Sequence, residues 1–177
     1  MVNIIAIPNR KSFGVTIVVG ESFEDGALPP LSAARGAVSI SSGSLLLGPG
    51  GALTLGPSFG IDSAIIVEAD VDGDRSSCSV VLATPERGRV LSVGGTGDVG
   101  DFSGKTVGSI ASANGRVAFS VEFKDGELYL RGASGSRPIV MRCAVKRFTL
   151  SLERAGGSGR ASFDRILVRD SVPPSET

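Results

Sequence analysis

The feature of this sequence that most constrains its fold is a succession of short apolar runs, each ended by glycine, serine, proline or aspartate. Apolar and polar residues alternate within the runs, most clearly in Val117–Phe123, and this period of two is typical of strands with one buried face. The runs recur roughly every 8–12 residues, the spacing of antiparallel sandwiches and barrels. No segment shows a convincing helical period of about 3.6 residues. The sequence therefore predicts an all-β fold, an antiparallel β-sandwich.

Composition narrows the chemistry that such a fold could carry. The chain has 177 residues, enough for one domain with a sizeable core. It contains no histidine, which excludes Ser-His-Asp and Cys-His nucleophiles and histidine-bearing zinc sites. Its 18 basic and 18 acidic side chains cancel and stacking aromatics are scarce, so we expect no nucleic-acid partner. No run approaches the roughly 18 apolar residues of a spanning helix, so we expect no membrane insertion.

Two cysteines, Cys78 and Cys143, fall in separate expected strands. They either form a disulfide across the sandwich or are two small buried apolar side chains, and the sequence leaves both alternatives open. The N-terminus has no basic residue before its short apolar run, so we do not expect that run to be a signal peptide.

Six segments share a pattern with a known superfamily: Glu21–Gly26, Gly36–Ile40, Gly43–Leu47, Ile65–Val71, Val117–Leu130 and Ser162–Val168. Through them, residues 21–170 resemble the concanavalin A-like lectin and glucanase superfamily of jelly rolls, most of all its laminin-G-like members. The resemblance implies a concanavalin A-like jelly roll over residues 21–170. An N-terminal β-arm, residues 1–20, would precede it, and a tail, residues 171–177, would follow it.

The arm begins with an apolar, β-prone run in which Val2, Ile4, Ile5 and Ile7 are the candidate contact residues. Such a strand adds either to its own sheet or to the sheet edge of a neighbouring copy, and the sequence leaves both open. Charge gives a second reason to consider assembly, because residues 1–100 carry 6 basic and 10 acidic side chains and the remainder carries 12 and 8. Opposite patches on neighbouring copies could meet, or the charges are simply dispersed over the surface.

Glu68, Asp70 and Asp72 follow one another at every second residue, which places three carboxylates on one face of a strand. The pattern resembles the Glu-x-Asp-x-Glu strand of the lichenase and laminarinase jelly-roll enzymes. Here Asp72 stands where the longer glutamate should deliver the proton, and the aromatics that stack on sugar rings are scarce. We therefore expect these acids to face water and the protein not to be an enzyme.

Asp70, Asp72 and Asp74 form an acidic turn that could bind calcium through clustered carboxylates. It is not an EF-hand loop, because Arg75 occupies the position that needs glycine and Val81 the position that needs a bidentate glutamate. The superfamily resemblance implies calcium at a loop, so calcium is the one cofactor that we consider. The alternative is a solvated strand end.

Gly95–Gly100 matches the dinucleotide-binding pattern G-x-G-x-x-G after an expected strand. A dinucleotide site needs a helix directly after the glycines, whereas Asp101–Gly104 and another strand follow here. We therefore expect a loop.

The leading functional hypothesis is a non-enzymatic structural subunit of a homomeric assembly, such as a virion component or an extracellular surface filament. The alternative is a carbohydrate-binding, lectin-like module, calcium-assisted in one version, which the superfamily resemblance implies. In that case loop acids such as Asp98 and Asp101 are candidates for glycan contact. Either hypothesis places the protein outside the cell or in a virion.

Overall fold

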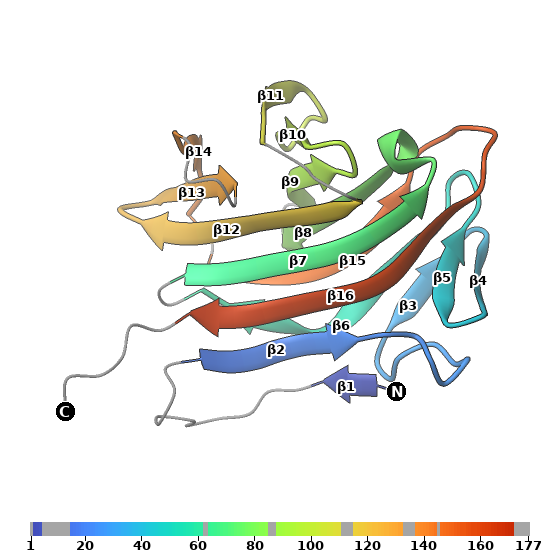
Figure 1. Cartoon of the computed structure of the whole chain (residues 1–177). Helices are drawn as coiled ribbons and strands as arrows, with labels where there is room; N and C mark the ends of the chain where they lie inside the picture. Colours follow the sequence, from blue (N-terminus) through green and yellow to red (C-terminus); the bar gives the residue numbers. More distant parts are fainter. Residues whose placement is uncertain are drawn as a thin grey trace.

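A computed structural model of the chain describes residues 2–4, 15–61, 64–84, 88–110, 115–132, 137–144 and 146–171. In these residues two antiparallel β-sheets face each other, and the only helical element is one turn of 3-10 helix, η1 (Arg75–Ser77) (Figure 1). The predicted all-β antiparallel sandwich is confirmed. No helix among the described residues is long and apolar enough to span a membrane.

The front sheet of Figure 1 contains most of the chain's long strands. Its order is β1 (Val2–Ile4), β2 (Val15–Glu21), β16 (Ala161–Ser171), β7 (Ala64–Gly73), β12 (Arg116–Lys124), β13 (Glu127–Gly132) and β14 (Ile139–Arg142). A hairpin of β4 (Val38–Ser41) and β5 (Ser44–Leu47) joins this sheet where β5 pairs with the beginning of β16.

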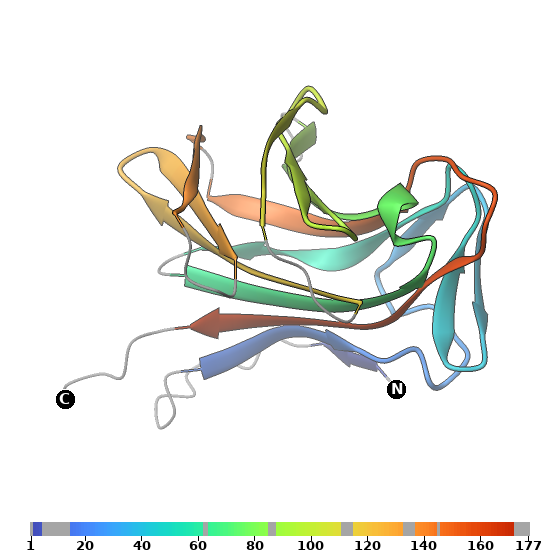
Figure 2. The same cartoon turned by 45° about the horizontal axis from the view of Figure 1, so that its top comes forward.

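The back sheet packs against the inner face of the front sheet. Its order is β11 (Thr106–Ser109), β10 (Asp98–Gly100), β9 (Gly88–Gly94), β8 (Cys78–Thr84), β15 (Arg147–Arg154), β6 (Ala52–Gly60) and β3 (Ala33–Arg35). Turned by 45°, the molecule shows the β4–β5 hairpin at one end of the sandwich (Figure 2). Strands β11 and β14 both lie at the top of the sandwich in this view. These two strands are the last of their respective sheets.

Strand β7 shows how the sequence sets the two faces of a sheet. Its outward residues include Glu68, Asp70 and Asp72, as the sequence predicted, because successive side chains of a strand point to opposite faces. The residues between them face the back sheet and are buried: Ile65, Val67, Ala69 and Val71.

Phenylalanines fill the space between the sheets. Phe23, Phe119, Phe148 and Phe163 are all fully buried, and each contributes roughly 1.5–3 kcal/mol of hydrophobic stabilisation. They come from segments far apart in the sequence, so the core forms only when both sheets are assembled. This core fixes the backbone positions from which the outward side chains project.

The N-terminal run extends the molecule's own front sheet. In β1, Val2 lies opposite Glu21 of β2, and Ile4 lies opposite Val19. Ile5 and Ile7, the other two residues of the expected arm contact, lie outside the described residues, as does the tail after residue 171. Within the expected arm of residues 1–20, β2 is an inner strand between β1 and β16.

Neither Cys78 nor Cys143 is in a disulfide and both are buried, so the structure has the second alternative, two small buried side chains. Cys78 begins β8 and Cys143 follows β14, and burial raises the pKa of the Cys78 thiol above its usual value. Of the Gly95–Gly100 pattern, Gly95–Gly97 form the turn between β9 and β10, and Asp98–Gly100 are strand β10; no helix follows directly. Gly95 is required in the turn because a Cβ would collide with the backbone carbonyl of Arg75. The expected loop is confirmed for Gly95–Gly97, whereas the rest of the pattern is a short strand.

Candidate functional site

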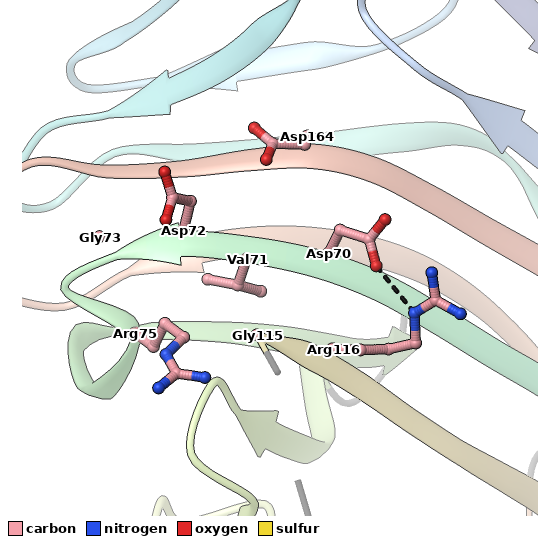
Figure 3. Close-up of a pocket in the computed structure, with 8 residues that line it drawn as sticks. All are labelled: Asp70, Val71, Asp72, Gly73, Arg75, Gly115, Arg116 and Asp164. Atoms are coloured by element: carbon pink, nitrogen blue, oxygen red, sulfur yellow. Dashed lines mark hydrogen bonds and ion pairs between the residues drawn. The ribbon is translucent and has the colours of Figure 1, made fainter. Parts of the chain in front are cut away.

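An open, polar hollow of about 1100 Å³ lies on the outer face of the front sheet, where β7 ends and β12 begins. Two arginines and three carboxylates contribute most of its chemistry (Figure 3). The residues that line it are Asp70, Val71, Asp72, Gly73, Arg75, Gly115, Arg116 and Asp164.

Strand register brings charged residues from three strands to this place. Asp70 and Asp72 share the outer face of β7 because they are two residues apart. Arg116, the first residue of β12, lies opposite Asp70, and Ser162 of β16 lies opposite Asp72. Residues separated by more than forty positions in the sequence thus become neighbours.

A β-bulge in β16 supplies the third carboxylate. Phe163 lies opposite Val71 of β7 and Arg165 lies opposite Asp70, which leaves Asp164 as an extra residue between them. Asp164 is exposed, while Phe163 before it and Ile166 after Arg165 are buried. Asp164 and Arg165 therefore both lie on the outer side, and the bulge brings one more carboxylate to the hollow than a regular strand would.

Asp70 is already bound by two arginines. Arg116 Nε donates to Asp70 Oδ1 at 2.9 Å, and Arg165 Nε forms an ion pair with Asp70 Oδ2 at 3.4 Å. The hydrogen bond to Asp70 raises the pKa of Arg116 above its usual value. Two residues before Asp70 on β7, Glu68 Oε2 accepts a hydrogen bond from Arg169 Nη2 at 3.2 Å. Both oxygens of Asp70 and Oε2 of Glu68 are therefore occupied by the protein's own cations.

Asp72 and Asp164 differ from Asp70 in having no ion pair with an arginine among the described residues. Asp164 Oδ1 accepts a hydrogen bond from Ser44 Oγ at 2.6 Å. The side chain of Asp72 is exposed and makes no hydrogen bond within the described part of the chain. Arg75 forms no ion pair with any described residue. In Figure 3 Asp72 and Asp164 lie on adjacent strands, and Arg75 lies on the other side of β7. These three side chains are available to a ligand.

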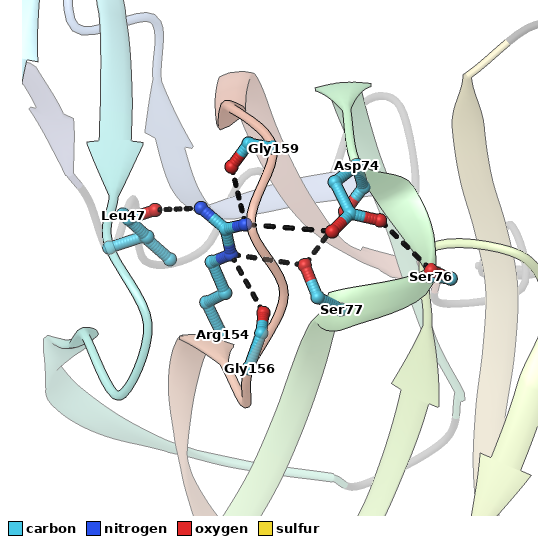
Figure 4. A network of polar contacts seen from close by, with 7 residues as sticks. All are labelled: Leu47, Asp74, Ser76, Ser77, Arg154, Gly156 and Gly159. Carbon is cyan, nitrogen blue, oxygen red and sulfur yellow. Dashed lines mark hydrogen bonds and ion pairs between the residues drawn. The ribbon is translucent and has the colours of Figure 1, made fainter.

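Asp74, the third residue of the predicted calcium site, lies beyond Gly73 and faces a different cluster (Figure 4). Its Oδ2 forms an ion pair with Arg154 Nη2 at 3.5 Å, and its Oδ1 accepts from Ser76 Oγ at 2.9 Å. The Arg154 side chain is only 2% exposed.

Arg154 is the centre of that cluster. It donates to the carbonyl oxygens of Leu47 at 2.9 Å, Gly156 at 3.1 Å and Gly159 at 2.5 Å, and to Ser77 Oγ at 3.1 Å. The guanidinium thereby connects β5, the loop before β16 and the end of η1. Asp74 is part of a structural network rather than of the hollow.

The three carboxylates predicted for calcium therefore do not meet. Asp70 is paired with arginines, Asp72 faces the hollow and Asp74 binds Arg154. In the described ranges no group of three acidic, cysteine or histidine residues is placed to hold a metal ion. The donor set that calcium prefers is not assembled by this strand and turn.

The loop acids expected to contact a glycan lie in and directly after β10 of the back sheet, and neither lines the hollow. Asp98 begins β10, and Asp101 follows it in a turn. Asp101 Oδ1 accepts from Ser103 Oγ at 2.7 Å and from the backbone N–H groups of Ser103 at 2.9 Å and Lys105 at 3.1 Å. The Ser103 hydroxyl, the strongest influence, lowers the pKa of Asp101. Oδ1 of Asp101 is therefore committed to its own turn.

Sequence reasoning missed Arg116 and Asp164 as site residues. One signal for Asp164 was present, because Phe163 and Ile166 are three residues apart and so break the period of two. No local signal marks Arg116, since its position opposite Asp70 depends on how two distant strands pair.

Comparison with known proteins places the fold. No protein-family model matches the sequence, and no curated protein matches it. Among solved structures, the potassium-bound carbohydrate recognition domain of Emp46p is similar with a TM-score of 0.55 and 12% identity, over 80% of this chain and 89% of that one. The exoplasmic/lumenal domain of VIP36, bound to Ca²⁺ and Man3GlcNAc, gives 0.53 and 10%, over 84% and 86%. A prokaryotic β-1,3-1,4-glucanase (lichenase) from a mouse hindgut metagenome gives 0.52 and 10%, over 86% and 98%.

Similarities at such low identity establish the architecture. The fold is a concanavalin A-like jelly roll, and the resemblance seen in the sequence is confirmed. One of these structures is a carbohydrate recognition domain, one is a domain bound to Man3GlcNAc and one is a glucanase, so the fold alone does not select a function. Function has to be argued from the site.

Proposed function

We propose that this protein is a carbohydrate-binding, lectin-like module and that the hollow at the end of β7 is its binding site. The observation that carries the proposal is a set of three charged side chains there, Asp72, Asp164 and Arg75, that form no ion pair with a described residue and lie on an open surface; Oδ1 of Asp164 accepts from Ser44 and Ser162. A carbohydrate recognition domain and a domain bound to Man3GlcNAc, both of the same fold, support the choice of ligand class. They support it better than they support a subunit of a virion or filament.

The chemistry of the hollow suits sugar hydroxyls. Each hydroxyl is both donor and acceptor, so a carboxylate can accept from it while a guanidinium donates to it. Asp72 and Asp164 offer acceptors from neighbouring strands, and Arg75 offers donors on the other side of β7. Adjacent hydroxyls of one pyranose ring match such an arrangement.

The hollow contains no aromatic side chain among its lining residues, so a bound ring has no stacking partner there. Recognition then depends on hydrogen bonds that compete with water, each contributing about 0.5–1.5 kcal/mol. We expect weak binding of single sugars, with dissociation constants nearer ~1 mM than ~1 µM, and tighter binding only when several copies engage a multivalent glycan.

We propose further that the module is not catalytic. A glycosidase needs one carboxylate to attack and another to deliver a proton. Here Oε2 of Glu68 accepts from Arg169, both oxygens of Asp70 are bound by Arg116 and Arg165, and the shorter Asp72 stands at the third position. The lichenase shares the architecture, but these ion pairs favour recognition over hydrolysis.

The experiment is a glycan microarray followed by calorimetry with the best glycan, in buffer containing either calcium or EDTA. The double variant Asp72→Asn/Asp164→Asn should bind at least tenfold more weakly. The matched control is Asp98→Asn, which removes an exposed carboxylate on the back sheet and should bind as the unaltered protein does. EDTA should leave binding unchanged, because the described carboxylates do not assemble a metal site. A glycan that binds the double variant equally well, or no glycan at all, would contradict the proposal.

Homomeric assembly stays a prediction with its own test. If the N-terminal run Val2–Ile7 joins subunits, the purified protein should form particles much heavier than the 18.0 kDa chain, and deletion of residues 1–12 should abolish them. Light scattering with negative-stain imaging measures both. A species near the chain mass would remove that hypothesis. An extracellular location stays a prediction for either function.

A further inference from the structure

A second, smaller hollow of about 360 Å³ lies at the side of the sandwich where both sheets end. It opens between β14, the last strand of the front sheet, and β11, the last strand of the back sheet (Figure 2). We call it the edge groove and define it by Val90, Phe102, Val107, Val140, Met141 and Arg142, which are among its lining residues.

The edge groove carries an unusual amount of exposed apolar surface. Phe102 is 75% exposed, Val140 is 44% exposed and Val107 is 42% exposed, although each is a large hydrophobic residue. Phe102 does not lie on a loose loop, since Asp101 before it accepts three hydrogen bonds from Ser103 and Lys105. Clustered apolar side chains on a well-ordered turn mark a contact surface.

The backbone at the groove is open for pairing as well. As terminal strands, β11 and β14 each have one side of the backbone without a strand partner in the described part of the chain. The two sheets come close at one point: a Cβ on Gly108 of β11 would lie 2.8 Å from Ile139 Cδ1 of β14. Because Gly108 has no side chain, β11 and β14 can approach each other at this point, and the groove lies open next to it. An extended segment could hydrogen-bond to a free strand edge and place a side chain in the groove.

Positive charge predominates around the groove. Arg89 Nη2 forms an ion pair with Glu153 Oε1 at 2.9 Å. Asp101, whose carboxylate accepts only from neutral donors of its own turn, is the one negative charge among the lining residues. Arg137 lies just before β14, and Arg142 is its last residue. Both are exposed, and neither forms an ion pair with any described residue. The charge left for a partner is therefore positive at both ends of the edge strand.

We propose that the edge groove binds an extended segment of a partner polypeptide, with an apolar side chain in the groove and acidic residues on either side. The segment adds to β14 as a further strand, its apolar side chain contacts Phe102 and Val107, and its acids pair with Arg137 and Arg142. The groove shares no residue with the hollow at the end of β7, so this inference stands or falls independently of glycan binding.

The test is selection from a phage-displayed library of random eight-residue peptides, with the full chain as bait. We expect enrichment of sequences with aspartate or glutamate flanking valine, isoleucine or leucine. A selected peptide, synthesised and labelled, should bind at least tenfold more weakly to Phe102→Ser and to Arg142→Glu, measured by fluorescence polarisation. N-methylation of alternate peptide nitrogens should abolish binding, because it removes the donors that pair with the strand edge.

Leu31→Ser is the matched control, since Leu31 is a 79% exposed hydrophobic residue elsewhere and its loss should change nothing. Because Phe102 is also exposed, its variant should fold, and thermal unfolding checks that it does. The proposal is overturned if no peptide is enriched over selection on Phe102→Ser, or if the enriched peptides are basic. It is also overturned in favour of self-association if light scattering shows a dimer that Phe102→Ser dissociates and no peptide competes with it.

Discussion

Asp72 and Asp74 are two residues apart in one acidic turn, yet they belong to different parts of the molecule. Asp72 is on the exposed outer face of β7 and forms no ion pair with any described residue. Asp74, after Gly73, binds Arg154, whose side chain is 2% exposed. The two aspartates thus have different roles because Asp72 faces solvent and Asp74 faces a buried arginine. One is open to a ligand, and the other helps to neutralise a charge inside the protein.

The largest effect should come from the buried side of this comparison. Arg154→Leu removes five contacts and leaves carbonyl oxygens such as that of Leu47 without a donor, so we expect a loss of about 3 kcal/mol in the free energy of unfolding. Urea unfolding followed by circular dichroism measures it. Arg89→Leu removes the 39% exposed arginine of the Arg89–Glu153 pair and should cost below about 1 kcal/mol. Equal losses in the two variants would show that burial does not distinguish them.

Asp74→Asn should be the next most destabilising change. It keeps the shape of the side chain and removes the negative charge next to Arg154, for an expected loss of about 2 kcal/mol. The same denaturation experiment reports it, and the double variant with Arg154→Leu should lose less than the sum of the single losses. Additive losses would mean that the two side chains do not interact.

Glu21 extends the comparison to a buried carboxylate with no arginine. Its residue is 4% exposed, Oε1 accepts from the Phe23 N–H at 2.7 Å, and Oε2 is buried without a hydrogen bond in the described structure. Burial is the main cause that raises the pKa of Glu21 above its usual 4.5. The native state therefore binds the proton more tightly than the unfolded state, so stability should fall as pH rises from 4.5 through the raised pKa.

Glu21→Gln should remove that part of the pH dependence. At pH 7 we expect its free energy of unfolding to exceed that of the unaltered protein by up to about 1 kcal/mol, so it should unfold at a higher temperature. Melting temperatures of both proteins across a pH series provide the measurement. Parallel curves for the two proteins would exclude Glu21 as the source.

Asp72→Asn should have the smallest effect on stability, within about 0.5 kcal/mol, because its carboxylate faces solvent. Its effect should appear in glycan binding instead. A variant that loses stability as Asp74→Asn does would erase the contrast between the two aspartates.

The parts of this structure that follow from local pattern were predictable. Alternation in residues 65–71 sets which side chains of β7 are buried, and the turn residues around Gly95 predict a loop. The Asp74–Arg154 pair was not predictable, because it depends on how residues 80 positions apart meet after both sheets have formed. The edge groove was hidden for the same reason: nothing near Val140 indicates that β14 and β11 are both terminal strands.

The bulge at Asp164 has a consequence for how such a site can arise. If Asp164 were deleted, the strand would be regular: Phe163 would face the core, Arg165 would face outward and Ile166 would face the core. One inserted codon is therefore enough to give the hollow a carboxylate without turning any core residue outward. Ligand specificity on this scaffold can change by insertion or deletion of a single residue, at little risk to the fold.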